Sequence, residues 1–240
     1  MSEQLPPARP HLKFTEDGRR IREVLTYARR GSRFTPSRQE AWEEHHDKWV
    51  IPDEAVGDPG FTLERWFGRK APIVVEIGSG IGEATAALAA GRPDQDILAF
   101  EVWRPGVATT LGLLADAGVD NVRLISVDAV WALEHLLTPG SLEELWTFFP
   151  DPWPKKKHHK RRLVTARFAA LAASRLKPGG LWRLATDWEE YAGQMQEVLD
   201  AEPLLTGGRT PRWSERPVTK FERKGVAAER TIVDLTYNAR

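Results

Sequence analysis

The sequence predicts an α/β fold in which a mostly parallel β-sheet is covered by helices on both faces. From Ile73 onward, short β-branched runs alternate with longer Ala- and Leu-rich runs. The 240 residues, 41% of them hydrophobic, are also enough for one large domain with a sizeable core. Strands separated by helices need crossover connections, so they pair in parallel and bind ligands at their carboxyl ends.

Each element follows from its own pattern. β-branched and aliphatic runs predict strands at 73–78, 96–102, 122–128, 142–149, 181–187 and 231–237. Ala- and Leu-rich runs predict helices at 82–91, 105–118, 129–137 and 162–176. Residues typical of helix ends support these helix boundaries. Gly91 ends the first helix, Pro105 begins the second and "KPGG" ends the last.

Composition excludes several classes of protein. The chain has 34 basic and 34 acidic residues, so a nucleic-acid partner would have to be recognised by a local patch. It has no cysteine, which excludes a disulfide scaffold and thiolate metal ligands and suits a reducing compartment. No apolar run approaches a membrane span and the N-terminus lacks a signal peptide's apolar segment, so we expect a cytoplasmic protein without membrane contact.

The segment "EIGSGIG" joins the first predicted strand to the first helix. Gly78, Gly80 and Gly82 let the backbone approach a ligand closely, although such a turn can also be no more than a tight connection. A dinucleotide fingerprint needs its third glycine where this chain has Glu83, which disfavours a pyrophosphate ligand and an oxidoreductase. Glu76 instead suits a cationic ligand without phosphate, such as S-adenosylmethionine, which carries a sulfonium and an ammonium.

Two further acids end the next strands. Glu101 ends "LAFEV", where a carboxylate can accept hydrogen bonds from both ribose hydroxyls of a nucleoside. Asp128 ends "ISVD", where its carboxylate, or the backbone beside Ala129, could bind the amine of adenine; alternatively, Asp128 caps the following helix. The candidate cofactor-binding residues are thus Glu76, Gly78, Gly80, Gly82, Glu101, Asp128 and Ala129.

Asp151 stands between two prolines in "FFPDPWPKKKHHKRR", just past the strand predicted at 142–149. The prolines stiffen the backbone, so a carboxylate held there could orient a nucleophile or stabilise a developing positive charge. Trp153 offers an aromatic face on which a base could stack. This strand end therefore carries the candidate catalytic residue.

A dense basic run follows directly. Its members are Lys155, Lys156, Lys157, Lys160, Arg161 and Arg162, with His158 and His159 among them. It suits binding to phosphates, although charge runs are often only the solvated start of a helix. Like charges at the start of the helix predicted at 162–176 would oppose its dipole, and this cost favours a binding role. Without cysteines or a ligand pair of helical spacing, the histidines do not predict a metal site.

With these motifs, the chain resembles the bacterial tRNA (guanine-N7)-methyltransferases over roughly residues 25–235. The motifs that carry the resemblance, in the family's order, are "EIGSGIG", "FEVWRPGV", "FPDPWPKKKHHKRRL", "LATDWEEY" and "TKFERKG". The resemblance implies a class I S-adenosylmethionine-dependent methyltransferase, Rossmann-like, with a mostly parallel seven-stranded sheet and helices on both faces. It also implies methyl transfer from S-adenosylmethionine to N7 of the variable-loop guanine of tRNA.

The resemblance assigns further roles by position. Acids that surround the cofactor correspond to Glu76, Glu101, Asp128 and Asp151, the last being also the catalytic residue. Substrate contacts correspond to Lys155 and Asp187, and a further substrate-binding loop to Thr219, Lys220, Phe221 and Glu222. The RNA-interacting stretch corresponds to Lys157, His158, His159, Lys160, Arg161 and Arg162.

Without the resemblance, the sequence allows more than one role for Asp187 and for the segment "TKFERKG". Asp187 ends a strand, where its oxygens could accept hydrogen bonds from guanine N1 and N2, or could cap the next helix. "TKFERKG" is by itself a charged, solvated loop, in which Lys220 and Arg223 could hold phosphate and Phe221 could pack or stack. Another RNA or DNA base methyltransferase is the main alternative, since "PDPW" resembles motifs of exocyclic-amine enzymes. A non-catalytic RNA-binding protein would leave the acids unexplained.

We divide the chain into three parts. Residues 1–20 are expected to be a disordered leader, 21–70 an Arg-rich extension that packs on the core, and 71–240 the methyltransferase domain. An arginine group near the N-terminus could be a second tRNA-backbone contact or a solubilising arm; its members are Arg19, Arg20, Arg22, Arg29, Arg30 and Arg33. We expect a monomer or homodimer without an obligate protein partner.

Overall fold

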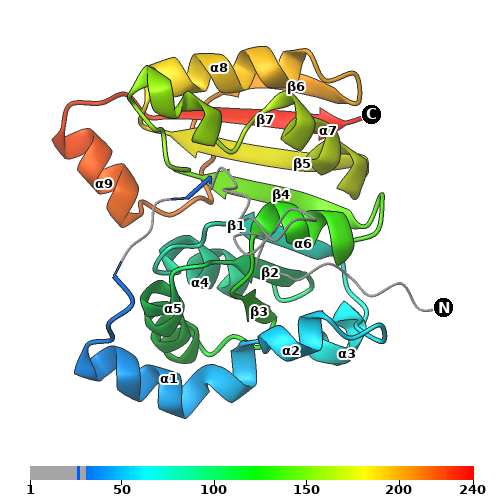
Figure 1. Ribbon diagram of the computed structural model, residues 1–240, viewed down its shortest axis with the longest axis vertical. Coiled ribbons are helices and arrows are strands. Elements are labelled where there is room, and N and C mark those ends of the chain that lie inside the picture. Colours follow the sequence, from blue (N-terminus) through cyan, green and yellow to red (C-terminus); the bar gives the residue numbers. More distant parts are fainter. Residues whose placement is uncertain (1–25, 28–30) are drawn as a thin grey trace, which may run out of the picture.

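A single twisted sheet organises the protein. The computed structural model describes residues 26–27 and 31–240, so the expected leader 1–20 and all of the grouped arginines except Arg33 lie outside the described residues. The strands are β1 (Ile73–Ile77), β2 (Asp96–Phe100), β3 (Val122–Ile125), β4 (Leu142–Phe148), β5 (Leu176–Thr186), β6 (Leu205–Thr210) and β7 (Val233–Ala239). They form one seven-stranded sheet in the order β3-β2-β1-β4-β5-β7-β6 (Figure 1).

The order in which the strands are added to the sheet reverses at β1. β1 pairs in parallel with β2 on one side and β4 on the other, while β7 is antiparallel to both β5 and β6. The chain therefore builds outward from β1 to β3 and then returns to β4, which leaves a crevice at the carboxyl ends of β1 and β4. The predicted mostly parallel sheet is confirmed, and the antiparallel β6–β7 pair completes its edge.

Helices cover both faces of the sheet. The helices are α1 (Pro36–Trp49), α2 (Asp53–Val56), α3 (Leu63–Phe67), α4 (Glu83–Ala90), α5 (Arg104–Ala117), α6 (Ala129–His135), α7 (Ala166–Arg175), α8 (Glu189–Asp200) and α9 (Lys220–Ala227). Neighbouring strand residues point to opposite faces, so Val74 joins the core beneath α4 and α5, whereas Val75 joins the core beneath α6, α7 and α8. Within the described residues, no helix has the length and apolarity that crossing a bilayer requires.

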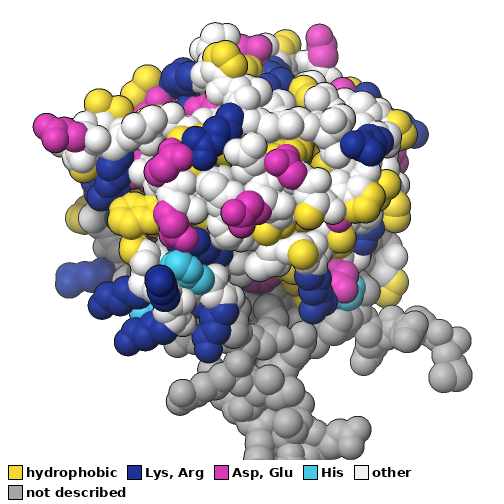
Figure 2. Space-filling model, turned by 90° about the horizontal axis from the view of Figure 1, so that it is seen from above, with side chains coloured by type: hydrophobic (Ala, Val, Ile, Leu, Met, Phe, Trp, Pro, Cys, Tyr) yellow, Lys and Arg dark blue, Asp and Glu magenta, His cyan; other side chains and the backbone are white. Residues whose placement is uncertain are grey.

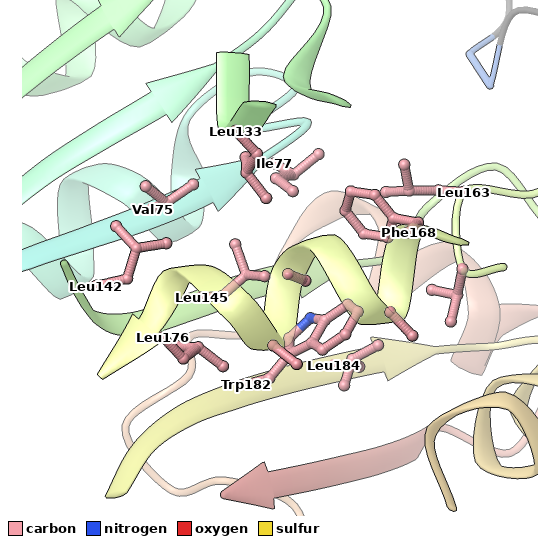
Figure 3. Packing of buried hydrophobic residues seen from close by; sticks show 14 of the residues in the cluster. Val75, Ile77, Leu133, Leu142, Leu145, Leu163, Phe168, Leu176, Trp182 and Leu184 are labelled. Carbon is pink, nitrogen blue, oxygen red and sulfur yellow. The ribbon is translucent and has the colours of Figure 1, made fainter. Parts of the chain in front are cut away.

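The core on the α6–α8 face is the larger of the two clusters. Figure 3 shows Val75, Leu145 and Trp182 from the strands packed with Leu133 and Phe168 from the helices. The Phe168 and Trp182 rings meet edge to face at 5.7 Å between centroids, a favourable aromatic geometry. This packing fixes the strand ends that carry the candidate site.

The helix predicted at 162–176 begins later than expected. Thr165 caps α7 by accepting a hydrogen bond from the Phe168 N–H, and the basic run forms a separate 3-10 helix, η2 (Lys156–Arg161). The run therefore does not lie at the start of α7, and the argument from an opposed helix dipole was wrong. The "KPGG" segment also does not follow the helix as a turn, because it lies inside β5 at a break in the β4–β5 register.

The segment "TKFERKG" was expected to be a loop, but from Lys220 onward it forms α9. Thr219 is the N-cap of this helix and accepts a hydrogen bond from the Glu222 N–H at 3.5 Å. The pattern Thr-x-x-Glu is the sequence signature of a helix start, so this helix was open to prediction. Figure 1 shows α9 beside the carboxyl ends of β4 and β5.

Candidate functional site

The glycine loop between β1 and α4 forms one wall of the candidate site. Gly78, Gly80 and Gly82 have φ of 75°, 65° and 80°, in the left-handed region that side chains rarely adopt. Glu101 holds this loop, since its Oε2 accepts a hydrogen bond from the Gly80 N–H at 2.7 Å and its Oε1 accepts one from the Trp103 N–H at 2.8 Å. The carboxylate thereby joins the connections that follow β1 and β2.

Two glycine contacts press this loop against α5. A Cβ on Gly82 would lie 2.4 Å from Thr110 Cγ2, and a Cβ on Gly106 would lie 2.0 Å from the Gly80 carbonyl oxygen. Gly82 is thus required for packing and does not line the cavity. Gly106 was not predicted as a site residue, although the quoted motif "FEVWRPGV" contains it.

A cavity opens at the carboxyl ends of the first four strands. It brings together the predicted residues Gly78, Gly80, Glu101, Asp128, Ala129, Asp151 and Phe221. Residues that the sequence analysis did not assign also line it, among them Thr26, Tyr27, Trp103, Phe149 and Leu163. Four separate strand ends and α9 therefore converge on one space, as a ligand site in a sheet of this kind requires.

Glu76 lies away from the lining of this cavity, in the interior. Its side chain is buried and its Oε2 accepts a 2.5 Å hydrogen bond from Thr85 Oγ1. Desolvation raises the pKa of Glu76 from 4.5 to about 7; the Thr85 hydrogen bond opposes the shift and the nearby Glu101 charge adds to it. In this structure the Glu76 carboxylate is thus bonded to Thr85 and does not line the cavity.

Asp128 caps a helix and also lines the cavity. Its Oδ1 accepts hydrogen bonds from the Val130 and Trp131 N–H groups at 2.9 and 3.2 Å. Asp128 therefore caps α6, which was one of the two roles predicted for it. Asp128 and Ala129 also line the cavity, so the cap does not remove the residue from the site.

The turn around Asp151 has an unusual backbone. Phe149 and Trp153 have φ of 52° and 46°, an uncommon conformation for residues with large side chains. The Arg161 guanidinium lies 3.5 Å from the Trp153 ring centroid, and His158 meets the ring edge-on. One face of Trp153, where a base was expected to stack, is thus occupied by Arg161.

The basic run is mostly exposed. Lys155, Lys156, Lys157 and Lys160 are exposed, and Figure 2 shows Lys, Arg and His side chains gathered at one edge of the upper face. Desolvation and the neighbouring cationic residues Lys157 and Arg161 lower the pKa of His158.

Arg162 does not belong to this exposed surface. Its side chain is 2% exposed, forms two hydrogen bonds to the Glu190 carboxylate and donates to the Pro152 carbonyl oxygen. Unlike the exposed lysines, Arg162 thus connects the basic run to α8 in this structure. The Arg162 guanidinium carbon also lies 4.7 Å from the centroid of the Tyr191 ring.

The C-terminal residues that resemble substrate contacts are engaged in ion pairs. Asp187 Oδ2 accepts a 2.6 Å hydrogen bond from Arg230, and it does not cap α8, whose N-cap is Trp188. Glu222 is buried between Arg212 and Arg216, with N–O distances of 2.7 and 2.5 Å. Burial opposes ionisation of Glu222, but both arginines stabilise its charge, and the net effect is a lowered pKa.

Comparison with known proteins identifies the family. A family profile described as "Putative methyltransferase" matches residues 70–235. A tRNA (guanine-N(7)-)-methyltransferase of a Nocardioides species is 68% identical over 234 residues, covering 98% of this chain and 94% of that protein. The chain belongs to the tRNA (guanine-N(7)-)-methyltransferase family. A family member from Cutibacterium acnes is 50% identical over 92% of this chain and 85% of its own length.

Solved structures support the fold assignment independently of these relatives. The 16S rRNA methyltransferase KamB has a TM-score of 0.53 at 13% identity, covering 74% of this chain and 92% of that one. An antibiotic-related methyltransferase has a TM-score of 0.51 at 11% identity, covering 78% and 98% of the two chains. The predicted class I methyltransferase fold is thereby confirmed.

No metal centre accompanies the cavity in the part of the chain that the structure describes. There, His, Cys, Asp and Glu side chains form no group of three that could hold an ion. The chemistry that the described residues offer is that of carboxylates, backbone amides, aromatic rings and exposed cations.

Replacing Gly106 by Ala should disturb the glycine loop. Because the new Cβ would overlap the Gly80 carbonyl oxygen at 2.0 Å, we expect affinity for S-adenosylhomocysteine to fall roughly tenfold or more. Isothermal titration calorimetry measures this. Gly112→Ala on the same helix is the control, since its Cβ would meet only Ala41 at 4.0 Å; equal affinities in both variants would contradict the assigned contact.

Glu76 should make stability depend on pH in the protein without ligand. Since the native pKa of about 7 exceeds the ordinary 4.5, the unfolded state releases this proton first and stability falls as pH rises between those values. Relative to Glu76→Gln, the wild-type free energy of unfolding should fall by about 3 kcal/mol across this window. Urea unfolding at several pH values checks it, and parallel curves for the two proteins would refute it.

Proposed function

We propose that the chain transfers a methyl group from S-adenosylmethionine to N7 of the variable-loop guanine in tRNA, in the cytoplasm. Membership of the tRNA (guanine-N(7)-)-methyltransferase family gives the reaction class. The observation that carries the residue assignment is that Asp151 lines the same cavity as the glycine loop, Glu101 and Asp128. A nucleoside cofactor at those strand ends would therefore lie beside the candidate catalytic carboxylate.

The donor groups fit such a cofactor. Glu101 already accepts two backbone hydrogen bonds, but a carboxylate has about four lone-pair sites and can also accept from ribose hydroxyls. Asp128 and Ala129 line the same cavity and are assigned to the adenine of the cofactor. Glu76 lies in the interior, so its assigned influence on the ammonium group is electrostatic, without direct contact. It requires the ionised carboxylate, which a bound cation favours.

The chemistry requires little of the protein beyond alignment and charge. S-adenosylmethionine, when bound, supplies an electrophilic methyl group on its sulfonium. Guanine N7 has an in-plane lone pair and no proton to release, so Asp151 need not act as a base. The methylated guanine is cationic, and a carboxylate beside it lowers the energy of the developing charge. Asp151 is therefore assigned to orientation and electrostatic stabilisation.

Exposed cations next to Asp151 are assigned to tRNA phosphates. Lys155, Lys156, Lys157 and Lys160 are accessible for this, whereas Arg162 is not. Asp187 is assigned to the guanine edge, because its Oδ2 accepts from Arg230 and the remaining lone pairs of the carboxylate can accept from guanine donors. Thr219 and Glu222 support this region indirectly, as the cap of α9 and the partner of Arg216.

The test uses purified protein, methyl-labelled S-adenosylmethionine and unmodified tRNA, with the labelled nucleoside identified by mass spectrometry after digestion. We expect label in 7-methylguanosine, lost when the variable-loop guanosine is replaced. Label in another nucleoside would keep the reaction class but overturn the target, as expected of another base methyltransferase. Cofactor binding without transfer to any nucleic acid would point to the non-catalytic alternative.

Asp151→Asn should lower kcat on the order of 100-fold, because it removes the negative charge while nearly keeping the shape. Single-turnover rates in H2O and D2O should be nearly equal in the wild-type protein, because no proton moves. A clear solvent isotope effect in the wild type, lost in Asp151→Asn, would instead assign proton transfer to Asp151. Asp116→Asn, on an exposed position of α5, is the control.

Replacing Lys157 and Lys160 by Gln should weaken tRNA binding and its salt dependence together. Each lost phosphate contact lowers the slope of log K against log salt by about 0.7 to 0.9. Filter binding at several salt concentrations measures the slope. Lys70→Gln, at an exposed position of the chain outside η2, is the control, and an unchanged slope in the double variant would exclude these lysines from the interface.

A further inference from the structure

Glu83 joins two segments that are far apart in the sequence. It is the first residue of α4, directly after the glycine loop, at the position where a dinucleotide fingerprint has glycine. Its Oε2 accepts a 2.5 Å hydrogen bond from the Lys220 backbone N–H, and its Oε1 accepts a 2.6 Å hydrogen bond from the Arg223 guanidinium. Both partners belong to α9, so one carboxylate spans from the glycine loop to that helix.

The two bonds stabilise the start of α9. Lys220 is the first residue of α9, and N–H groups in the first turn of a helix have no partner within it. The carboxylate supplies one, and its negative charge complements the helix dipole. Thr219 caps the same turn from within the chain. Glu83 therefore acts as a second cap, contributed by a different helix.

The helix that Glu83 holds touches the cavity with one residue and displays cations elsewhere. Phe221 lines the cavity, and its ring lies 3.6 Å from the place of a Cβ on Gly80. Lys220, Arg223 and Lys224 of the same helix are exposed. A shift of α9 would thus change the wall of the cofactor cavity and the position of these cations at once.

Other ion pairs of α9 connect it to β7, away from the glycine loop. Arg216 is 1% exposed and bridges Glu222 of α9 to Asp234 of β7, with N–O distances of 2.5 and 2.8 Å. These bonds hold the helix to the sheet but do not reach the glycine loop. The contact from α9 toward the cofactor loop is made by Glu83 and by the Phe221 ring.

We propose that Glu83 is a positioning residue that couples the two substrates: it holds α9 against the glycine loop, so that a nucleoside cofactor in the cavity and tRNA on α9 bind cooperatively. The inference rests on the proposed function, since it takes the RNA substrate from there. It adds a role for a residue that neither the cavity lining nor the motif assignments include. Ordering of the glycine loop by the cofactor is transmitted to α9 through the carboxylate.

The test measures a thermodynamic cycle with full-length protein. Binding of unmodified tRNA is measured by filter binding with and without saturating S-adenosylhomocysteine, for wild type, Glu83→Ala, Glu83→Gln and a control. In the wild type, S-adenosylhomocysteine should tighten tRNA binding about 5-fold or more. In Glu83→Ala this factor should fall below about 2-fold, whatever the change in tRNA affinity without S-adenosylhomocysteine.

Two comparisons make the result specific. Glu83→Gln keeps an oxygen for the Lys220 N–H but loses the charge, so its coupling should be intermediate. The control is Glu189→Gln, which breaks an exposed pair of the same kind, Glu189 with Arg209 at 2.7 Å, and should keep the full coupling. A purely structural role would lower the thermal midpoint without changing the coupling factor.

Two outcomes would overturn the inference: no coupling in the wild type, or full coupling in both Glu83 variants. If Glu83→Ala fails to fold, the Glu83→Gln comparison still decides. Failure of the proposed function is a separate result, because it would appear as a wild-type protein that does not methylate tRNA. A wild type that methylates tRNA together with unaltered coupling in the variants would reject only the role of Glu83.

Discussion

The hydrogen bonds that Glu101 accepts from Gly80 and Trp103 are the interaction on which the site depends. They join the connections after β1 and β2, beside the crevice at the carboxyl ends of β1 and β4. Close packing reinforces them, because Gly106 lies against the Gly80 carbonyl with no room for a side chain. A left-handed backbone at the glycines is therefore maintained by hydrogen bonding on one side and by steric contact on the other.

Buried charge pairs hold α9 to the C-terminal part of the sheet. Arg216 is fully buried with Glu222 and Asp234, an arrangement in which the loss of hydration must be offset by good geometry. Removing one partner would leave a buried charge, so the network fixes α9 in one orientation. The antiparallel β6–β7 pair supplies the platform for this network at the edge of an otherwise parallel sheet.

The segment after β4 combines both kinds of support. Phe149 and Trp153 adopt uncommon backbone conformations. Arg161 and Arg162, at the end of the basic run, stabilise the turn through the Trp153 ring and the Pro152 carbonyl oxygen. The run therefore divides by function: its arginines bind the protein itself, whereas its lysines remain exposed. A chain segment that looks uniform in charge thus stabilises the turn that carries Asp151 and presents cations beside it.

Three features could be predicted from the amino-acid sequence alone: the alternation of strands and helices, the strand ends at which acids gather, and the family. These follow from local periodicity and from motifs of contiguous residues, which depend on neighbours in the chain. Only the tertiary structure decided that Glu76 lies in the interior, that Arg162 and Glu222 are buried in ion pairs, and that Gly106 and Glu83 support the site. Burial and pairing depend on partners from distant segments, and a local pattern carries no record of those partners.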